Sequence, residues 1–177
     1  MLAIQTVFWI FVLMFGLIGT MRGWAKEVVA TAGIVLALFA IETFNDPIQR
    51  LLAAQPNAAQ RFYIQSVLFL AFVLAAYQGP ALVRLASRGS ASPRASEGVR
   101  DALLGLLVGL ANGYLVAGTL WYYLHQQGYP FPANIMLPPA TDSPAADLVA
   151  RLPPALLKPY LPPALIILFI FVIVAMV

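Results

Sequence analysis

Residues 14–29 read MFGLIGTMRGWAKEVV, and this stretch joins two long apolar runs of the chain. Gly19 and Gly23 stand where an apolar helix would continue, and Arg22 and Lys26 come before the next apolar run begins. A glycine inside a helix costs about 1 kcal/mol relative to alanine in water. In lipid, close approach of two backbones through small residues is one of the few sources of affinity between helices. The glycines therefore indicate helices that pack against each other in a membrane.

A second stretch has the same glycine spacing. Residues 103–118 read LLGLLVGLANGYLVAG, with Gly105, Gly109 and Gly113 four positions apart. Residues four apart lie on one face of a helix, so this series, like the pair in the first stretch, predicts a flat strip for a neighbouring helix. A groove or pore lined by glycine backbone is the alternative. The predicted helix-packing residues are Gly19, Gly23, Gly105, Gly109, Gly113 and Asn112.

The composition predicts lipid as the solvent of this chain. Of its 177 residues, 62% are hydrophobic and 10% are charged, and the mean hydropathy is +0.86. A soluble domain is about 45–50% apolar and about 25% charged. There is no cysteine, which excludes disulfides, thiolate metal sites and a cysteine nucleophile. The formal charge of +3 brings no basic field with interleaved aromatic residues, so we expect no nucleic-acid partner.

Five apolar runs predict an all-α integral membrane protein with four transmembrane helices and a fifth after them. The runs are residues 1–20, 28–44, 63–83, 102–124 and 165–177. The first is too long for the apolar part of a signal peptide and has no basic residues before it, so we expect it to be retained. Counted from residue 161, the fifth has 17 residues, or about 25 Å of helix. A re-entrant helix is the alternative for this last run.

The segment before the fifth run is proline-rich. Ten of the fourteen prolines lie between residues 126 and 163, which rules out a long regular helix there. Ser143, Pro144 and Asp147 nevertheless predict a short helix on the membrane surface, capped by the serine and ending by Pro153. We therefore divide the chain into three parts. These are a four-helix transmembrane region at 1–124, a proline-rich extramembrane loop with a surface helix at 125–163, and a C-terminal transmembrane helix at 164–177.

The basic residues between the spans predict the orientation in the membrane. The first and third connections hold six of them, whereas the second and fourth hold four. The six are Arg22, Lys26, Arg84, Arg88, Arg94 and Arg100, and the four are Arg50, Arg61, Arg151 and Lys158. Because basic connections stay in the cytoplasm, this bias predicts an outside N-terminus and a cytoplasmic C-terminus.

Charged residues near the ends of the spans predict contacts with lipid headgroups. We assign Arg22, Lys26, Glu27, Arg84 and Arg88 to the membrane interface. A gating or ion-relay carboxylate is the alternative for Glu27, since an ionisable residue inside a membrane is a functional candidate.

Two further polar residues lie in the apolar runs. Glu42 comes near the end of the second run, from which its side chain can reach the interface. Asn112 lies near the middle of the fourth run, where an unpaired amide would be costly. We expect it to hydrogen-bond to another helix, with Gln65, Ser66 or Thr31 as the partner.

The sequence shows no pattern typical of an enzyme. No second histidine or carboxylate stands near His125 at the spacing of metal ligands, so the sequence does not support a metal site there. The serines at 87, 90, 92 and 96 lack the strand-turn-helix setting of a nucleophile. No glycine-rich phosphate loop follows a strand. We therefore expect no catalytic, cofactor-binding or metal-binding residues.

Three stretches resemble the CvpA family of bacterial inner-membrane proteins, named for colicin V production. They are GLIGTMRGWAKEVVATAGIVLAL at 16–38, RDALLGLLVGLANGYLVAG at 100–118 and DSPAADLVARLPPALLKPYLP at 142–162. In the first, Gly19, Gly23 and Glu27 match the family's spaced glycines with an acidic residue four positions further on. The resemblance implies a multi-pass protein of the inner membrane, connected with toxin production.

Three hypotheses of function follow. The first is a non-enzymatic protein of export or envelope physiology that acts through membrane lipids and a membrane-protein partner or a second copy of itself. The second is a scaffold subunit of a larger respiratory or photosynthetic complex. The third is a small channel or transporter with Glu42 and Asn112 on its pathway. Copurification in mild detergent would separate the first two, and ion flux in liposomes would test the third.

Overall fold

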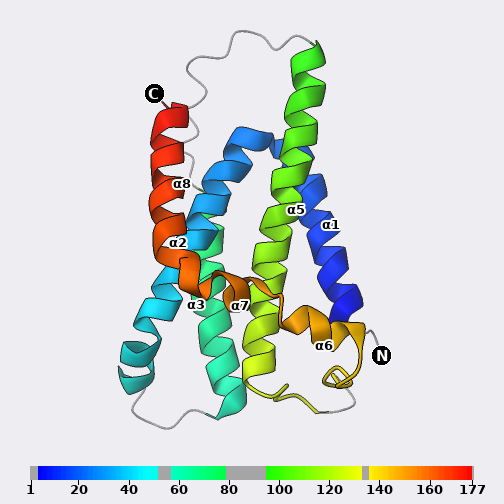
Figure 1. Ribbon diagram of the computed structural model, residues 1–177, viewed down its shortest axis with the longest axis vertical. Coiled ribbons are helices and arrows are strands. Elements are labelled where there is room, and N and C mark those ends of the chain that lie inside the picture. Colours follow the sequence, from blue (N-terminus) through cyan, green and yellow to red (C-terminus); the bar gives the residue numbers. More distant parts are fainter. Residues whose placement is uncertain (1–3, 52–56, 79–94, 133–135, 177) are drawn as a thin grey trace.

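The computed structural model describes residues 4–51, 57–78, 95–132 and 136–176. Over these residues the chain is helical, with no strand, as the sequence predicts (Figure 1). The long helices are α1 (Ile4–Arg22), α2 (Trp24–Leu51), α3 (Ala58–Gln78) and α5 (Ala95–Gln126). The shorter ones are α6 (Pro144–Val149), α7 (Pro153–Leu157), the 3-10 helix η2 (Lys158–Tyr160) and α8 (Leu161–Met176).

Four helices of the described residues are long and apolar enough to cross a membrane. They are Ile4–Arg22, Trp24–Phe44 within α2, Ala58–Gln78, and Gly98–Gln126 within α5. The prediction of an all-α membrane protein with four spans is confirmed. The helices α2 and α5 are longer than their apolar segments, because the backbone hydrogen bonds of a helix continue into polar flanking residues. Hydropathy identifies only the part of each helix that can lie in lipid. The third helix ends at Gln78, before the Gly-Pro pair that interrupts the apolar run there.

The helices form a bundle in which α1 lies along α5 (Figure 1). The other large contacts join α2 to α5, α3 and α8. Although α1 and α2 are consecutive, they touch little. The N-terminal end of α1 and the C-terminal end of α8 lie at opposite ends of the bundle in Figure 1. In the bundle α5 therefore lies between α1 on one side and α2 with α3 on the other, and α8 lies against α2.

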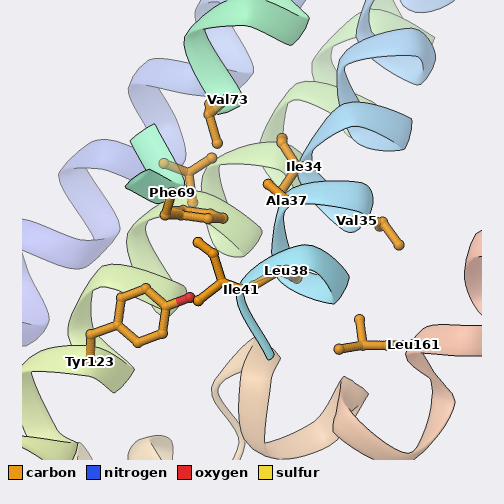
Figure 2. Close-up of a cluster of buried hydrophobic side chains, with 10 residues drawn as sticks. Ile34, Val35, Ala37, Leu38, Ile41, Phe69, Val73, Tyr123 and Leu161 are labelled. Carbon is orange, nitrogen blue, oxygen red and sulfur yellow. The ribbon is translucent and has the colours of Figure 1, made fainter. Parts of the chain in front are cut away.

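The main core lies between α2, α3 and α5 (Figure 2). Ile34 and Phe69 are fully buried there, and the Phe69 ring meets the edge of the Tyr123 ring at a centroid distance of 6.1 Å. Leu161, in the first turn of α8, belongs to the same cluster. Lipid is as apolar as these side chains, so dispersion and close packing, and not exclusion of water, hold this core together.

A second cluster joins the proline-rich segment to α1 and α5. It contains Phe8, Trp121, Tyr129, Val149 and Leu152. The Trp121 indole donates a hydrogen bond of 3.1 Å to the Tyr129 hydroxyl. Burial raises the pKa of that hydroxyl above its ordinary value, and the Trp121 hydrogen bond opposes the shift in part.

The start of the proline-rich segment has the local structure that the sequence predicts. The Ser143 side chain accepts a hydrogen bond of 3.3 Å from the Ala146 amide, and Pro144 opens α6. With six residues, α6 ends at Val149, before the predicted limit at Pro153. A second short helix, α7, then begins at Pro153, since proline fits the first turn of a helix.

The proline-rich segment is docked on the bundle. A Cβ added at Gly118 of α5 would lie 2.5 Å from Pro153 Cδ, so the glycine leaves the space that this proline fills. The Tyr114 hydroxyl donates a hydrogen bond to the Arg151 carbonyl oxygen. Leu152 is fully buried between these contacts. The segment is thus held to α5 at three neighbouring residues.

The C-terminal helix α8 has 16 residues, or about 24 Å at about 1.5 Å per residue. It begins at Leu161, three residues before the start of the predicted C-terminal helix at 164, because two prolines can occupy its first turn. It packs on α2. Its outward-facing side chains are large and apolar, with exposed fractions of 47–70%. They are Ile166, Ile167, Phe169, Ile170, Ile173 and Val174.

Candidate functional site

The spaced glycines bring the backbones of α1 and α5 into contact. Gly19 and Gly105 face each other, and a Cβ added to either would collide with the carbonyl oxygen of the other. A Cβ at Gly109 would lie 2.5 Å from the Phe15 carbonyl oxygen, and one at Gly113 would lie 2.8 Å from Val12 Cα. The geometry is that of small residues allowing two membrane helices to touch.

Gly23 has a different role from the one that its spacing predicts. The sequence placed it on the same helical face as Gly19, but α1 ends at Arg22 and Gly23 has a positive φ of 83°. Its amide donates a hydrogen bond of 3.0 Å to the Gly19 carbonyl oxygen, as glycines that end helices do. A Cβ there would also lie 2.5 Å from the Asp101 carboxylate. Gly23 therefore forms the turn between α1 and α2, and the prediction that it continues the helical face of Gly19 is wrong. Its backbone still lies against α5, since a Cβ added at Gly105 would lie 3.3 Å from the Gly23 carbonyl carbon.

Glu27 forms the centre of a buried polar cluster at the Gly23 end of the bundle. Its Oε1 lies 2.9 Å from Arg22 Nε, which makes an ion pair between α1 and α2. Its Oε2 accepts hydrogen bonds from the Tyr77 hydroxyl at 3.0 Å and from Asn112 Nδ2 at 2.9 Å. Groups from α1, α3 and α5 thus converge on one carboxylate of α2.

The assignment of Glu27 to the lipid interface is wrong, because its side chain is fully buried. Gly23 turns the chain sharply, and the first turn of α2 then points Glu27 into the bundle instead of toward lipid headgroups. Lys26, the next residue back, is exposed. Arg22 is intermediate, with 28% of its side chain exposed. Arg84 and Arg88 lie outside the described residues.

Asn112 satisfies its hydrogen bonds within the same cluster. Besides the carboxylate, its Nδ2 donates to the Glu27 carbonyl oxygen at 3.0 Å. Its Oδ1 accepts from Thr31 Oγ1 at 2.7 Å. Thr31 is thus the partner found among the three that the sequence suggested, while Gln65 and Ser66 are buried on α3. Both amide protons and the amide oxygen are used, so Asn112 joins α5 to the start of α2.

Arg22 also ties α1 to the end of α3. Its guanidinium lies over the Tyr77 ring, 4.5 Å from the centroid, and Nη2 donates to the Tyr77 carbonyl oxygen at 3.3 Å. A cation over an aromatic face is attracted by the ring quadrupole, and more strongly where water is excluded. Tyr77 therefore contacts both members of the ion pair, Glu27 through its hydroxyl and Arg22 through its ring.

Asp101 is a site residue that the sequence reasoning missed. Its Oδ1 accepts a hydrogen bond of 3.3 Å from the Trp24 amide, the first residue of α2. A carboxylate is favourable at the positive N-terminal end of a helix. In the sequence, Asp101 is the acidic residue directly before the fourth apolar run, and this position could have identified it. In the structure it faces the turn at Gly23. Asp101 thus caps α2 from another helix.

The other polar residues singled out from the sequence lie away from this cluster. Glu42 pairs with Lys158 of η2, with 43% and 62% of the two side chains exposed. His125 Nδ1 lies 3.3 Å from the Tyr129 hydroxyl. Within the described residues, no group of three or more His, Cys, Asp or Glu side chains could hold a metal ion.

The spans, the glycine contact and the buried ion pair define a multi-pass α-helical membrane protein. A family model described as Colicin V production protein matches residues 4–154. The chain therefore belongs to the colicin V production, or CvpA, family, as its resemblance predicts. The matched part includes the whole polar cluster, whereas α8 follows it. No curated protein and no solved structure shows a significant match to the chain.

Proposed function

We propose that this protein acts in export or envelope physiology at the bacterial inner membrane, without catalysis of its own, through protein partners. The observation that carries the proposal is α8. This helix packs on α2, and the first turn of α8 enters the main core. It presents six large apolar side chains outward. It also lies beyond the segment matched by the family model, which ends at residue 154.

The shape of α8 supports docking on a protein. The helix is apolar on every side and carries no charge and no glycine between residues 161 and 176. A lone helix of this kind can slide or tilt in lipid at a modest cost, whereas one docked on a protein has a defined depth. Its outward residues are branched or aromatic, shapes that are stiff and suit a groove.

Deletion of residues 165–177 should leave a membrane-inserted protein that remains soluble in detergent but no longer copurifies with its partner. The four spans should keep most of their contacts, because the described α8 residues that pack in the main core, Leu161, Ala164 and Leu165, lie in the first five positions of the helix. Purification from native membranes in mild detergent, with identification of the bound proteins, measures the loss.

A matched pair of point variants sharpens this test. Ile170→Ala changes the outward face of α8 and should weaken copurification, whereas Leu36→Ala on the exposed face of α2 should not. Degradation or aggregation of the truncated chain would place α8 in the intramolecular core, and the proposal of a protein partner would lose its main support.

We further infer that the connection between α3 and α5 faces the cytoplasm, because the basic residues favour that side. The chain has no native cysteine, so single cysteines can report the orientation. Ser90→Cys should be labelled by a membrane-impermeant reagent only from the cytoplasmic side, and Ser143→Cys only from the outer side. One predicted span, α5, lies between the two positions. Labelling of both from the same side would therefore show that the chain does not cross the membrane an odd number of times between them.

A further inference from the structure

The net charge of the chain is concentrated at the Gly23 end of the bundle. Residues 22–27 form the turn from α1 into α2, and residues 79–101 connect α3 to α5 and begin that helix. Together these two segments hold six basic and three acidic residues, which leaves a net charge of +3. The whole chain also has a formal charge of +3, so the charges of all other residues balance.

Two of the cations at this end are exposed and available to an external anion. Lys26 lies in the first turn of α2, and Arg100 lies near the start of α5. In the part of the chain that the structure describes, neither side chain forms an ion pair. Arg22 differs from both, because it is partly buried and its charge is balanced by Glu27 inside the bundle.

The two exposed cations lie close to one contact between α2 and α5. The Trp24 amide donates a hydrogen bond of 3.3 Å to Asp101 Oδ1 there. Lys26 comes two residues after Trp24, and Arg100 comes directly before Asp101. Both are thus within one helical turn of the same contact, and long basic side chains can extend to a headgroup while their stems stay in the apolar region. The headgroup of a single lipid is therefore within reach of both.

An apolar face of α5 continues from Arg100 into the membrane. Leu103, Leu104 and Leu107 follow it by three, four and seven positions, the spacing of one helical face, and all three are exposed. Arg100 itself lies at the beginning of the span Gly98–Gln126. In Figure 1 the start of α5 reaches beyond the turn between α1 and α2. An acyl chain on these leucines would therefore have its phosphate beside the arginine.

We propose that the Gly23 end binds an anionic phospholipid, with its phosphate on Lys26 and Arg100 and an acyl chain on the leucine face of α5. Charge gives the selectivity, because a zwitterionic headgroup brings a cation of its own that the two side chains repel, whereas an anionic headgroup brings none. The sequence assigned Lys26 to headgroups in general and did not single out Arg100. This lipid site is independent of partner docking at α8.

Native mass spectrometry of the full chain in an uncharged detergent can measure lipid binding. The wild type should bind phosphatidylglycerol more tightly than phosphatidylcholine. Lys26→Gln and Arg100→Gln should each weaken phosphatidylglycerol binding about fivefold, and the double variant about 25-fold, as expected for one basic side chain each at an anionic headgroup. Binding of phosphatidylcholine should stay the same in all of them. Equal affinity of the wild type for the two lipids would overturn the proposal.

The combined variant Arg151→Gln and Lys158→Gln is the matched control, since it removes two exposed cations from the opposite end. It should leave phosphatidylglycerol binding nearly unchanged, because charges further apart than a Debye length of about 8 Å are largely screened. Equal losses in the two double variants would show attraction by overall charge and would overturn the site.

Inorganic phosphate distinguishes a lipid site from a site for free phosphate. It should not release the bound phosphatidylglycerol, because it offers no acyl chain to the leucines of α5. Release by inorganic phosphate at the concentration of the lipid would assign the two cations to free phosphate and would also overturn the lipid proposal. Circular dichroism of each variant checks that the helices are retained, and the single variants suffice if the double variant does not fold.

Discussion

Glu27→Ala should lower the free energy of unfolding by about 3 kcal/mol, measured by denaturation in mixed detergent micelles. Removing one member of a buried ion pair costs about 3–5 kcal/mol when the other charge is left buried. We expect the lower end because Arg22 is 28% exposed and can reach the headgroups. The substitution also leaves the Tyr77 hydroxyl and Asn112 Nδ2 without the carboxylate that each contacts.

Glu42→Ala is the matched control, since it removes another glutamate of α2 that forms an ion pair. Both members of that pair are exposed, Glu42 by 43% and Lys158 by 62%, and an exposed ion pair contributes less than about 1 kcal/mol. Glu42→Ala should therefore be nearly neutral. Equal losses in the two variants would show that burial of the Glu27 pair adds nothing to the stability of the bundle.

Gly109→Leu should disrupt the contact between α1 and α5, at a cost of about 3 kcal/mol. Overpacking costs about 1–3 kcal/mol when neighbouring side chains can shift, but here the first added atom would meet the Phe15 carbonyl oxygen at 2.5 Å. Backbone gives way less than a flexible side chain. Denaturation in mixed micelles measures the loss of stability, and proximity of α1 to α5 can be followed by cross-linking of introduced cysteines.

Ala111→Leu introduces the same side chain two residues away, at an exposed position of α5. It should change stability within about 0.5 kcal/mol, as exposed substitutions usually do. Leu107→Ala, also on the exposed face, should be similarly mild. If Gly109→Leu were as mild as these two, the glycine series would not hold the helices together.

Local patterns predicted the elements of the fold. Apolar run length identifies helices that cross a membrane because the hydrocarbon thickness sets how many apolar residues are needed. Ser143 and Pro144 predicted the start of α6, since capping depends on residues three positions apart. The glycine series of residues 105–113 predicted a contact strip, because the helix repeat fixes which residues share a face.

The same local patterns misplaced Gly23 and Glu27. Two glycines four positions apart share a helical face only if the helix continues from one to the other, but Gly23 adopts a positive φ and ends the helix. The sequence shows that glycine permits this conformation and does not show where the chain will use it. With α2 starting at Trp24, Glu27 turns inward, whereas an unbroken helix would allow it to reach the interface.

The sequence by itself determined the membrane-spanning helices, the family and the residues capable of close packing, because each depends on composition or on neighbours within a few turns. Only the tertiary structure decided that Glu27 is buried and what it binds. Tyr77 and Asn112 lie 50 and 85 positions further along the chain, and Asp101 lies 77 positions from the amide that it caps. No local periodicity relates residues so far apart. They meet because backbone contact between α1 and α5, together with the turn at Gly23, fixes where the helices cross.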